Sequence, residues 1–400
     1  MINKPGGTNT QSNLKKYVLI GGIVLIALNL RAPLAAVGPL VGDIQQTTHL
    51  SHGLIGLITT LPLLCFGFLS TMTPLFTRKW GIEGTLGIAL CLLSVGIVLR
   101  SVISITALYS GTLLLGIGIA LSNVLMPSLV KRDFSNQKGW MTSLYSSLMG
   151  VGATIAAGIS VPLANDLGWG WRYSLGCWVV LSVTAFIFWL PQLHGRTVPK
   201  RTISIRKSLR DLGQSLLAWQ IALFIGLQSF IFYIILAWLP EILIDQGMDV
   251  NTAGWMLALA QGTGVLGTIL LPAYAERLKD QRNIVWVIST LELVGIVGLL
   301  IPGTKFVPLW AGLIGFALGC SFGLALLFMV LRTQSSETTT ELSGMSQSIG
   351  YLVAATGPAL FGWIHDVTHS WTGPIILLLI VACCQLLAGL GAGRDEIISI

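Results

Sequence analysis

The feature that most limits how this chain can fold is a long succession of apolar stretches, each about as long as a bilayer is thick. A helix needs about 20 mostly apolar residues to cross the hydrocarbon core. Because lipid offers no hydrogen-bond partners, each stretch is expected to form a helix. The sequence therefore predicts an all-α membrane protein with twelve transmembrane helices, near residues 17–41, 51–76, 84–101, 105–130, 140–164, 171–190, 217–240, 253–275, 284–301, 306–331, 342–364 and 372–392.

The composition supports this class of protein and excludes others. Of the 400 residues, 54% are hydrophobic and 10% are charged, whereas soluble domains average about 25% charged residues. The net charge of +7 does not indicate nucleic-acid binding, because the basic residues fall in short gaps between apolar stretches rather than on one patch. Lys and Arg are concentrated in alternate connectors, which predicts a multi-pass protein of the bacterial cytoplasmic membrane with both termini in the cytoplasm.

One long polar connector divides the chain into two halves. We expect a cytoplasmic N-terminal tail at 1–16, a six-helix bundle at 17–190, a cytoplasmic linker at 191–216, and a second six-helix bundle with a short tail at 217–400. Nearly the same offset separates two pairs of matching positions, Pro74 with Pro272 and Asp166 with Asp366. This weak internal repeat predicts two pseudo-symmetric bundles.

Several short segments carry a resemblance to a known family. They are Asn29–Pro33, Ala36–Leu40, Trp238–Pro240, Gly344–Gly350 and Thr356–Pro358. Together they resemble the cyanate and 2-nitroimidazole permease branch of the major facilitator superfamily. The resemblance implies the major facilitator fold, a transport function, and a central cavity lined by the first, fourth, seventh and tenth spans.

The connector between the second and third spans departs from the pattern of that superfamily. Arg78 stands where the pattern has an acid, and Glu83 stands where it has a base. The corresponding connector of the second half keeps the acid as Glu276, followed by Arg277. We therefore expect a conformational latch made of Arg78, Lys79, Glu276 and Arg277, with its polarity rearranged.

Two ionisable residues, Arg31 and Glu292, are expected deep within spans. Inserting a charged residue at the centre of a transmembrane helix costs about 2.5–3.5 kcal/mol. Each of the two residues is therefore expected to have a structural or functional role. Arg31 presents five donors and keeps its proton, which suits an anion or a nitro group, although a structural contact with backbone carbonyls is the alternative. Glu292 lies on a span that the resemblance makes peripheral, so a structural role and a proton-carrying role both stay open. His365 and Asp366 are either a pH-sensing pair or a solvated helix end.

Small and polar side chains elsewhere in the spans indicate either contacts between helices or contacts with a substrate. Gly315, Gly319 and Gly323 share one face of the tenth span, and this face predicts close helix packing. Uncharged polar residues on the cavity-type spans either bond to a neighbouring helix or bind substrate beside Arg31. The candidate substrate ligands of this kind are Asn29, Asn123, Gln228, Tyr233, Gln261, Gln347 and Tyr351.

No catalytic motif stands out in the sequence. The chain has no phosphate-binding loop of the ATPase type, no metal-ligand spacing and no G-x-S-x-G motif. We therefore predict no enzyme activity, no cofactor and no metal. With the resemblance, the sequence predicts a secondary active transporter that moves a small anion or a compact polar organic solute by alternating access. Multidrug efflux, a membrane sensor and a membrane-embedded enzyme are the alternatives.

The expected partners follow from the predicted function. They are a small-molecule substrate, the lipid bilayer and, as one option for the coupling ion, protons. No nucleic acid is expected as a partner, and the protein is expected to act as a monomer.

Overall fold

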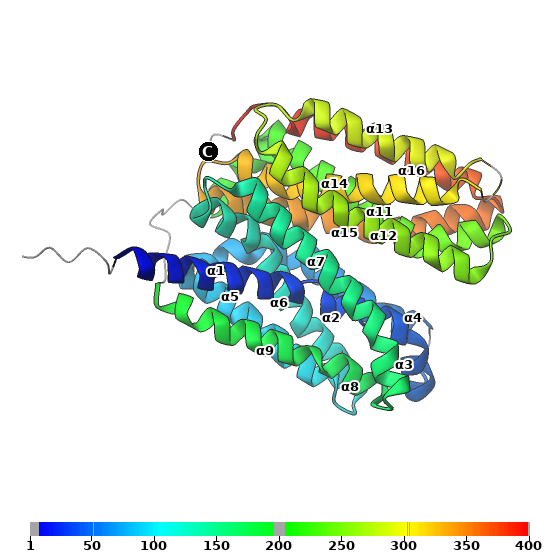
Figure 1. Cartoon of the computed structure of the whole chain (residues 1–400), viewed down its shortest axis with the longest axis horizontal. Helices are drawn as coiled ribbons and strands as arrows, with labels where there is room; N and C mark the ends of the chain where they lie inside the picture. Colours follow the sequence, from blue (N-terminus) through cyan, green and yellow to red (C-terminus); the bar gives the residue numbers. More distant parts are fainter. Residues whose placement is uncertain (1–7, 51, 196–204, 302, 304, 399–400) are drawn as a thin grey trace, which may run out of the picture. The chain divides into compact units, whose positions relative to one another are not determined.

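A computed structural model describes residues 8–50, 52–195, 205–301, 303 and 305–398 (Figure 1). In these ranges all regular structure is helical, and parts of the predicted tail (1–7) and linker (196–204) lie outside them. The α-helices are α1 (Thr8–Asn29), α2 (Ala32–Ala35), α3 (Val41–Thr48), α4 (His52–Leu69), α5 (Thr73–Arg100), α6 (Ile105–Asp133), α7 (Lys138–Val161), α8 (Gly170–Gly176), α9 (Trp178–Trp189), α10 (Ile205–Gln214), α11 (Leu216–Asp245), α12 (Val250–Ala275), α13 (Arg282–Gly298), α14 (Val307–Leu331), α15 (Ser336–Thr368) and α16 (Thr372–Ala392). Short 3-10 turns link some of them, at Gly38–Leu40, Ser70–Met72 and Leu190–Gly195, and a π-helical turn spans Pro162–Asp166.

The helices reproduce the twelve predicted spans. Within the described residues, nine helical stretches are long and apolar enough to cross a membrane. One of them, Leu57–Arg100, holds two spans, because the chain turns at Gly81, whose φ is 73°. Two further spans fall outside those nine: α13, which has 17 residues, and α15, which begins with a polar segment. The predicted fold class is therefore confirmed.

Contacts within the chain define two compact units. Unit 1 consists of Met1–Pro62, Phe76–Asn123 and Leu148–Pro199, and unit 2 consists of Leu63–Leu75, Val124–Ser147 and Lys200–Ile400. Unit 2 thus includes two segments from the first half of the sequence. The division at the linker into residues 17–190 and 217–400 follows chain order, and it stays a prediction.

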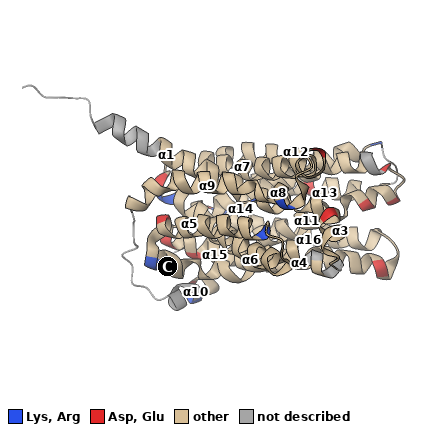
Figure 2. Ribbon diagram, turned by 90° about the horizontal axis from the view of Figure 1, so that it is seen from below, with Lys and Arg blue, Asp and Glu red and all other residues tan. Residues whose placement is uncertain are grey.

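The helices present apolar side chains outward, as expected in lipid. On α13, Ser289 and Glu292 are buried whereas Trp286, Val287 and Val294 are exposed. A soluble helix would turn its polar side chains outward. Most charged residues gather toward helix ends, where a transmembrane helix meets water (Figure 2).

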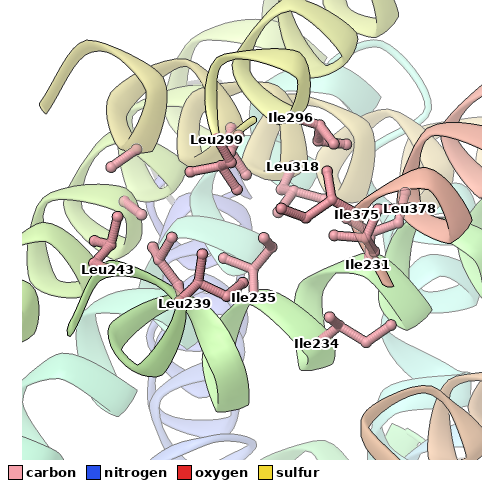
Figure 3. Close-up of a cluster of buried hydrophobic side chains, with 14 of the residues drawn as sticks. Ile231, Ile234, Ile235, Leu239, Leu243, Ile296, Leu299, Leu318, Ile375 and Leu378 are labelled. Atoms are coloured by element: carbon pink, nitrogen blue, oxygen red, sulfur yellow. The ribbon is translucent and has the colours of Figure 1, made fainter. Parts of the chain in front are cut away.

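The core of unit 2 is a cluster of branched aliphatic side chains (Figure 3). Helix α11 supplies Ile231, Ile234 and Leu239 from one stretch, and α13, α14 and α16 close the cluster around them. Lipid tails are as apolar as these side chains, so moving the side chains from lipid into the protein gains little free energy. Van der Waals contacts in a tightly packed core hold the helices together instead.

Helices α12 and α14 touch backbone to backbone. Gly315 and Gly319 of α14 lie against the carbonyl oxygens of Ala260 and Gly264 of α12, with no room for a side chain. At Gly267 a Cβ atom would lie 2.5 Å from the Phe316 oxygen. The prediction that this glycine face packs closely is confirmed.

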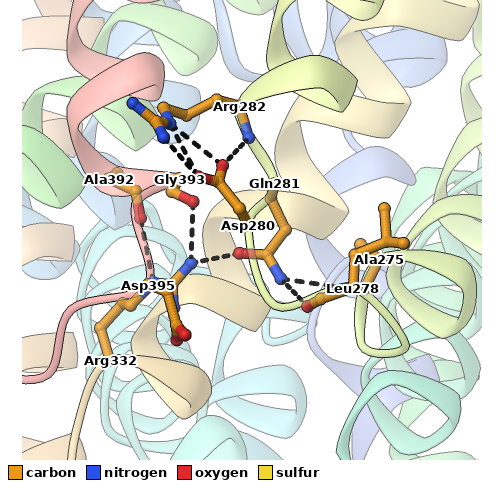
Figure 4. A network of polar contacts seen from close by, with 9 residues as sticks. All are labelled: Ala275, Leu278, Asp280, Gln281, Arg282, Arg332, Ala392, Gly393 and Asp395. Carbon is orange, nitrogen blue, oxygen red and sulfur yellow. Dashed lines mark hydrogen bonds and ion pairs between the residues drawn. The ribbon is translucent and has the colours of Figure 1, made fainter.

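A buried arginine ties together the ends of three helices of unit 2 (Figure 4). Arg332, just after α14, donates to the carbonyl oxygens of Ala392 at 3.0 Å and of Gly393 at 3.1 Å, at the end of α16. It also donates to the side-chain oxygen of Gln281, which precedes α13. Backbone carbonyls left open at helix ends are thus capped by a charged donor.

Replacing Gly319 with alanine should loosen unit 2, because the added methyl group meets the α12 backbone. We expect a loss of about 1–3 kcal/mol of stability. Melting of the purified protein in detergent measures this loss. Gly262→Ala is the matched control, since a Cβ atom at Gly262 meets nothing within 4 Å. Equal melting of both variants would contradict the packing argument.

Candidate functional site

The first span is broken at the segment that carries Arg31. Helix α1 ends at Asn29, and α2 begins at Ala32 with Arg31 as its N-cap residue. Pro33 at the second position of α2 lacks an N–H group and so fits the first turn of a new helix. The break leaves Arg31 half-buried in unit 1, between two helix ends.

Asn29 uses its amide to join two helices of unit 1. Its Nδ2 donates to the Leu25 oxygen at 2.8 Å and to the Leu181 oxygen of α9 at 3.3 Å. Its Oδ1 has no partner within the described part of the chain. Asn123, also in unit 1, is buried on α6. Asn29, a predicted substrate ligand, therefore also makes a hydrogen bond that joins α1 to α9.

The other five predicted ligands belong to unit 2. Gln228 on α11 donates to the Leu318 oxygen of α14 at 3.2 Å, and Gln347 on α15 donates to Ser343 at 2.8 Å. Both side chains are buried. The remaining three are Tyr233 on α11, Gln261 on α12 and Tyr351 on α15.

Tyr351 is buried and Tyr233 is half-buried. The Tyr351 ring lies 5.0 Å from the ring of Phe66 on α4, and Tyr233 packs edge-on against Phe232 at 5.3 Å. Gln261 is half-buried. The bonds from Gln228 to Leu318 and from Gln347 to Ser343 both lie within unit 2.

Two motif segments that carried the family resemblance meet in unit 2. The indole nitrogen of Trp238 on α11 donates to the Pro358 oxygen of α15 at 2.9 Å. Gly226 of α11 faces Gly350 of α15, where a Cβ atom would lie 3.0 Å from the Gly350 Cα. Trp238 and Gly350 of the motif segments, together with Gly226, thus fix the crossing of α11 with α15.

Glu276, a predicted latch residue, binds the N-terminus of α7. Its two carboxylate oxygens accept the backbone N–H groups of Lys138 at 2.8 Å and Gly139 at 2.7 Å. These groups are among those a helix leaves open at its start, and a negative charge there is favourable. Both partners belong to unit 2.

The other predicted latch residues differ in exposure. Arg277 and Lys79 are exposed, and Lys79 Nζ lies 4.8 Å from the centre of the Trp80 ring. Arg78 is half-buried on α5.

A second charged contact at a helix end was not predicted. Lys131, near the end of α6, donates to the Val330 oxygen at 2.9 Å and to the Thr333 oxygen at 2.5 Å, at the end of α14. A cation is favourable at the C-terminus of a helix. The sequence had marked Lys131 only as part of a basic connector.

Glu292 is fully enclosed among α13, α14 and α16 (0% exposed). Its Oε2 accepts from Gln385 Nε2 at 2.9 Å, and the same nitrogen lies 3.2 Å from Ser321 Oγ. Oε1 of Glu292 and Oε1 of Gln385, both acceptors, have no partner within the described residues. A neutral Glu292 supplies the donor that this cluster lacks.

His365 and Asp366 lie at the end of α15. The His365 ring stacks on Trp371, with centroids 3.8 Å apart, and its Nδ1 is 3.9 Å from Asp366 Oδ1. The Asp366 side chain is 84% exposed and the His365 side chain is 27% exposed.

The burial of Arg100 was not predicted either. This residue, expected at the end of the span 84–101, is the last residue of α5 and is fully buried (0% exposed). Its Nη1 donates to the Pro33 oxygen at 2.8 Å. A span end gives no sequence signal that separates an enclosed arginine from a solvated one.

Comparison with known proteins identifies the class of this fold. The sequence model of the Major Facilitator Superfamily matches residues 19–358. The chain superposes on the proton:xylose symporter XylE with a TM-score of 0.75, covering 96% of this chain and 97% of that one at 16% identity. The chain belongs to the major facilitator superfamily, and it is a multi-pass membrane transport protein.

Relatives place it in the branch that its motifs resemble. It is 38% identical to the 2-nitroimidazole transporter of Escherichia coli (strain K12), covering 96% of this chain and 98% of the relative. It is 29% identical to the cyanate transport protein CynX of the same organism, covering 89% and 91%. It is also 42% identical to the transporter YycB of Bacillus subtilis (strain 168), covering 96% of each chain.

Replacing Glu292 with glutamine should leave the protein folded and active, because glutamine is a neutral analogue of the protonated acid. Glu292→Ala should lower the melting temperature, since it opens a cavity and leaves Gln385 unpaired. Melting and substrate uptake are measured on the same preparations. If Glu292→Gln folds normally but loses pH-driven accumulation, Glu292 carries the coupling proton instead.

Proposed function

We propose that this protein is a secondary active transporter for a small anion or a compact polar solute of the cyanate or nitroimidazole kind. The observation that carries the proposal is the similarity, along nearly the whole chain, to a transporter named for 2-nitroimidazole. Cyanate and the nitro group share one chemical property: negative charge on small terminal atoms. A site for either needs concentrated positive charge or several N–H donors.

Arg31 is the proposed centre of the substrate site. It lies at the break in the first span, is half-buried, and carries a planar set of donors. A guanidinium group can bind two oxygen atoms of a nitro group or carboxylate with parallel hydrogen bonds. Because its charge is permanent, it needs an anion, carbonyls or water in every state of the cycle.

Glu276 is the proposed latch. Its carboxylate holds the start of α7, which belongs to the first half of the sequence, while Glu276 belongs to the second. In alternating access such a contact must break when the halves move, so its strength sets part of the barrier. Proton coupling and cytoplasmic termini are further parts of the proposal.

Variants at Arg31 test the substrate site. Loss of a charge-assisted hydrogen bond costs about 1.5–3 kcal/mol, so Arg31→Ala should bind 2-nitroimidazole or cyanate about 10- to 100-fold more weakly. Arg31→Lys keeps the charge but loses the planar fork, and it should fall between Arg31→Ala and the wild type. Isothermal titration with each compound measures these affinities.

Melting curves of the same preparations control for misfolding, and a panel of cationic drugs tests the multidrug alternative. If Arg31→Ala melts normally and binds both compounds as tightly as the wild type does, Arg31 is not the substrate ligand. Tight binding of cationic drugs only would favour multidrug transport.

Variants at Glu276 test the latch. Glu276→Gln removes the charge at the start of α7, which is worth about 0.3–2 kcal/mol, so the transport rate should change severalfold while substrate affinity at equilibrium changes little. Proteoliposome uptake gives the rate. Glu241→Gln, an exposed residue on α11, is the matched control. Unchanged transport in Glu276→Gln would argue against a latch at this contact.

A further inference from the structure

The break in the first span leaves the backbone carbonyl of Pro33 without its helical partner. The N–H groups of Leu34 and Ala35 both donate to the Arg31 oxygen, at 3.2 and 3.0 Å. The Val37 N–H then donates to the Leu34 oxygen at 3.3 Å, three residues back instead of four. This tightening leaves the Pro33 carbonyl outside the helical ladder.

Arg100, on helix α5, donates a hydrogen bond to the Pro33 carbonyl. Its Nη1 donates to the Pro33 oxygen at 2.8 Å, across 67 positions of the chain. Pro33 is buried and Arg100 is 0% exposed, and both belong to unit 1. A charged donor to a buried carbonyl makes a strong hydrogen bond, because no water competes for either group.

Close helix packing fixes the backbone of Arg100. A Cβ atom on Gly111 of α6 would lie 2.5 Å from the Arg100 nitrogen, and one on Gly96 of α5 would lie 2.5 Å from the Leu115 nitrogen. Helices α5 and α6 therefore touch through their backbones on both sides of this point. The guanidinium group of Arg100 therefore extends to the break in the first span from a backbone that is held in place by α6.

Burial of this guanidinium group is costly for stability. Nε and Nη2 of Arg100 have no hydrogen-bond partner within the described part of the chain. Taking an ion out of water costs several kcal/mol, which is offset only where its hydrogen bonds and charge are fully satisfied. The placement of Arg100 is thus poorly explained by stability alone, and the group that it holds lies two residues from Arg31.

We propose that Arg100 is a positioning residue, which holds the broken first span by the Pro33 carbonyl and thereby fixes the backbone that presents Arg31. This inference rests on the proposed function of Arg31 as substrate ligand. Helix α5 contributes no proposed substrate ligand. The inference gives α5 the role of holding the backbone that carries Arg31. The interaction is indirect, because Arg100 acts on substrate through the backbone of the break.

Three variants test the proposal: Arg100→Met, Arg100→Lys and, as matched control, Arg172→Met. Arg172 is an arginine of the same unit that lies over the Trp171 ring, 4.2 Å from its centre. In Arg100→Met, amide hydrogen exchange across residues 28–40 should quicken about tenfold or more. Exchange in other helices and the melting temperature should stay near wild type, and Arg172→Met should not affect residues 28–40.

Binding of 2-nitroimidazole gives the second readout. Its dissociation constant should rise in Arg100→Met and recover largely in Arg100→Lys, which keeps a charged donor. In an Arg31→Ala background, Arg100→Met should weaken binding no further, because the residue that it positions is gone.

Distinct results overturn the two proposals. Unchanged exchange at residues 28–40 in Arg100→Met, or faster exchange in every helix with early melting, refutes the positioning role. So does a full additional loss of affinity in the Arg31→Ala background. If the wild type binds neither 2-nitroimidazole nor cyanate, the proposed function fails, while the exchange data still decide whether Arg100 holds the break.

Discussion

Lipid supplies no hydrogen-bond partners, and the structure of this protein depends on that constraint. Helices satisfy their own backbones, so each end or break within the bilayer exposes carbonyl groups that need a donor. Arg100 serves in this way at Pro33, and Lys131 and Arg332, which follow predicted spans, donate to carbonyls at the ends of α14 and α16. The excess of cations, a formal net charge of +7, thus has a structural use besides orienting the chain.

The same constraint explains how much of the fold could be predicted. A span must be apolar over a fixed length, so its position can be read along the sequence. The predicted span 372–392 coincides with α16 (Thr372–Ala392), and the predicted span 105–130 lies within α6 (Ile105–Asp133). The face of Gly315 and Gly319 was predictable as well, because small residues at helical spacing allow close approach. Their partners, Ala260 and Gly264, were not, since spacing says nothing of the neighbouring helix.

The candidate site was less predictable for a related reason. Sequence placed Arg31 within a span, but it gave no sign that the helix breaks there or that Arg100 reaches the break. Asn29 and Gln228 were selected as polar residues in apolar surroundings, and both donate to backbone carbonyls of other helices. Glu276 was selected from a motif, yet its partners are two backbone N–H groups, which carry no sequence signature. Hydrogen bonds to backbone groups depend on the distance and crossing angle between two helices. The identity of a single residue does not specify that distance or angle.

The two kinds of buried ionisable group differ in what they require from their surroundings. A carboxyl group can take up a proton and become a neutral hydrogen-bonding partner, so Glu292 can remain enclosed beside Gln385, which also contacts Ser321. A guanidinium group keeps its charge and must be supplied with acceptors at all times. Arg100 is fully enclosed and donates to the Pro33 carbonyl, whereas Arg31 is half-buried. The difference in exposure between these two arginines is therefore the physical basis for assigning one to the substrate and the other to the backbone that presents it.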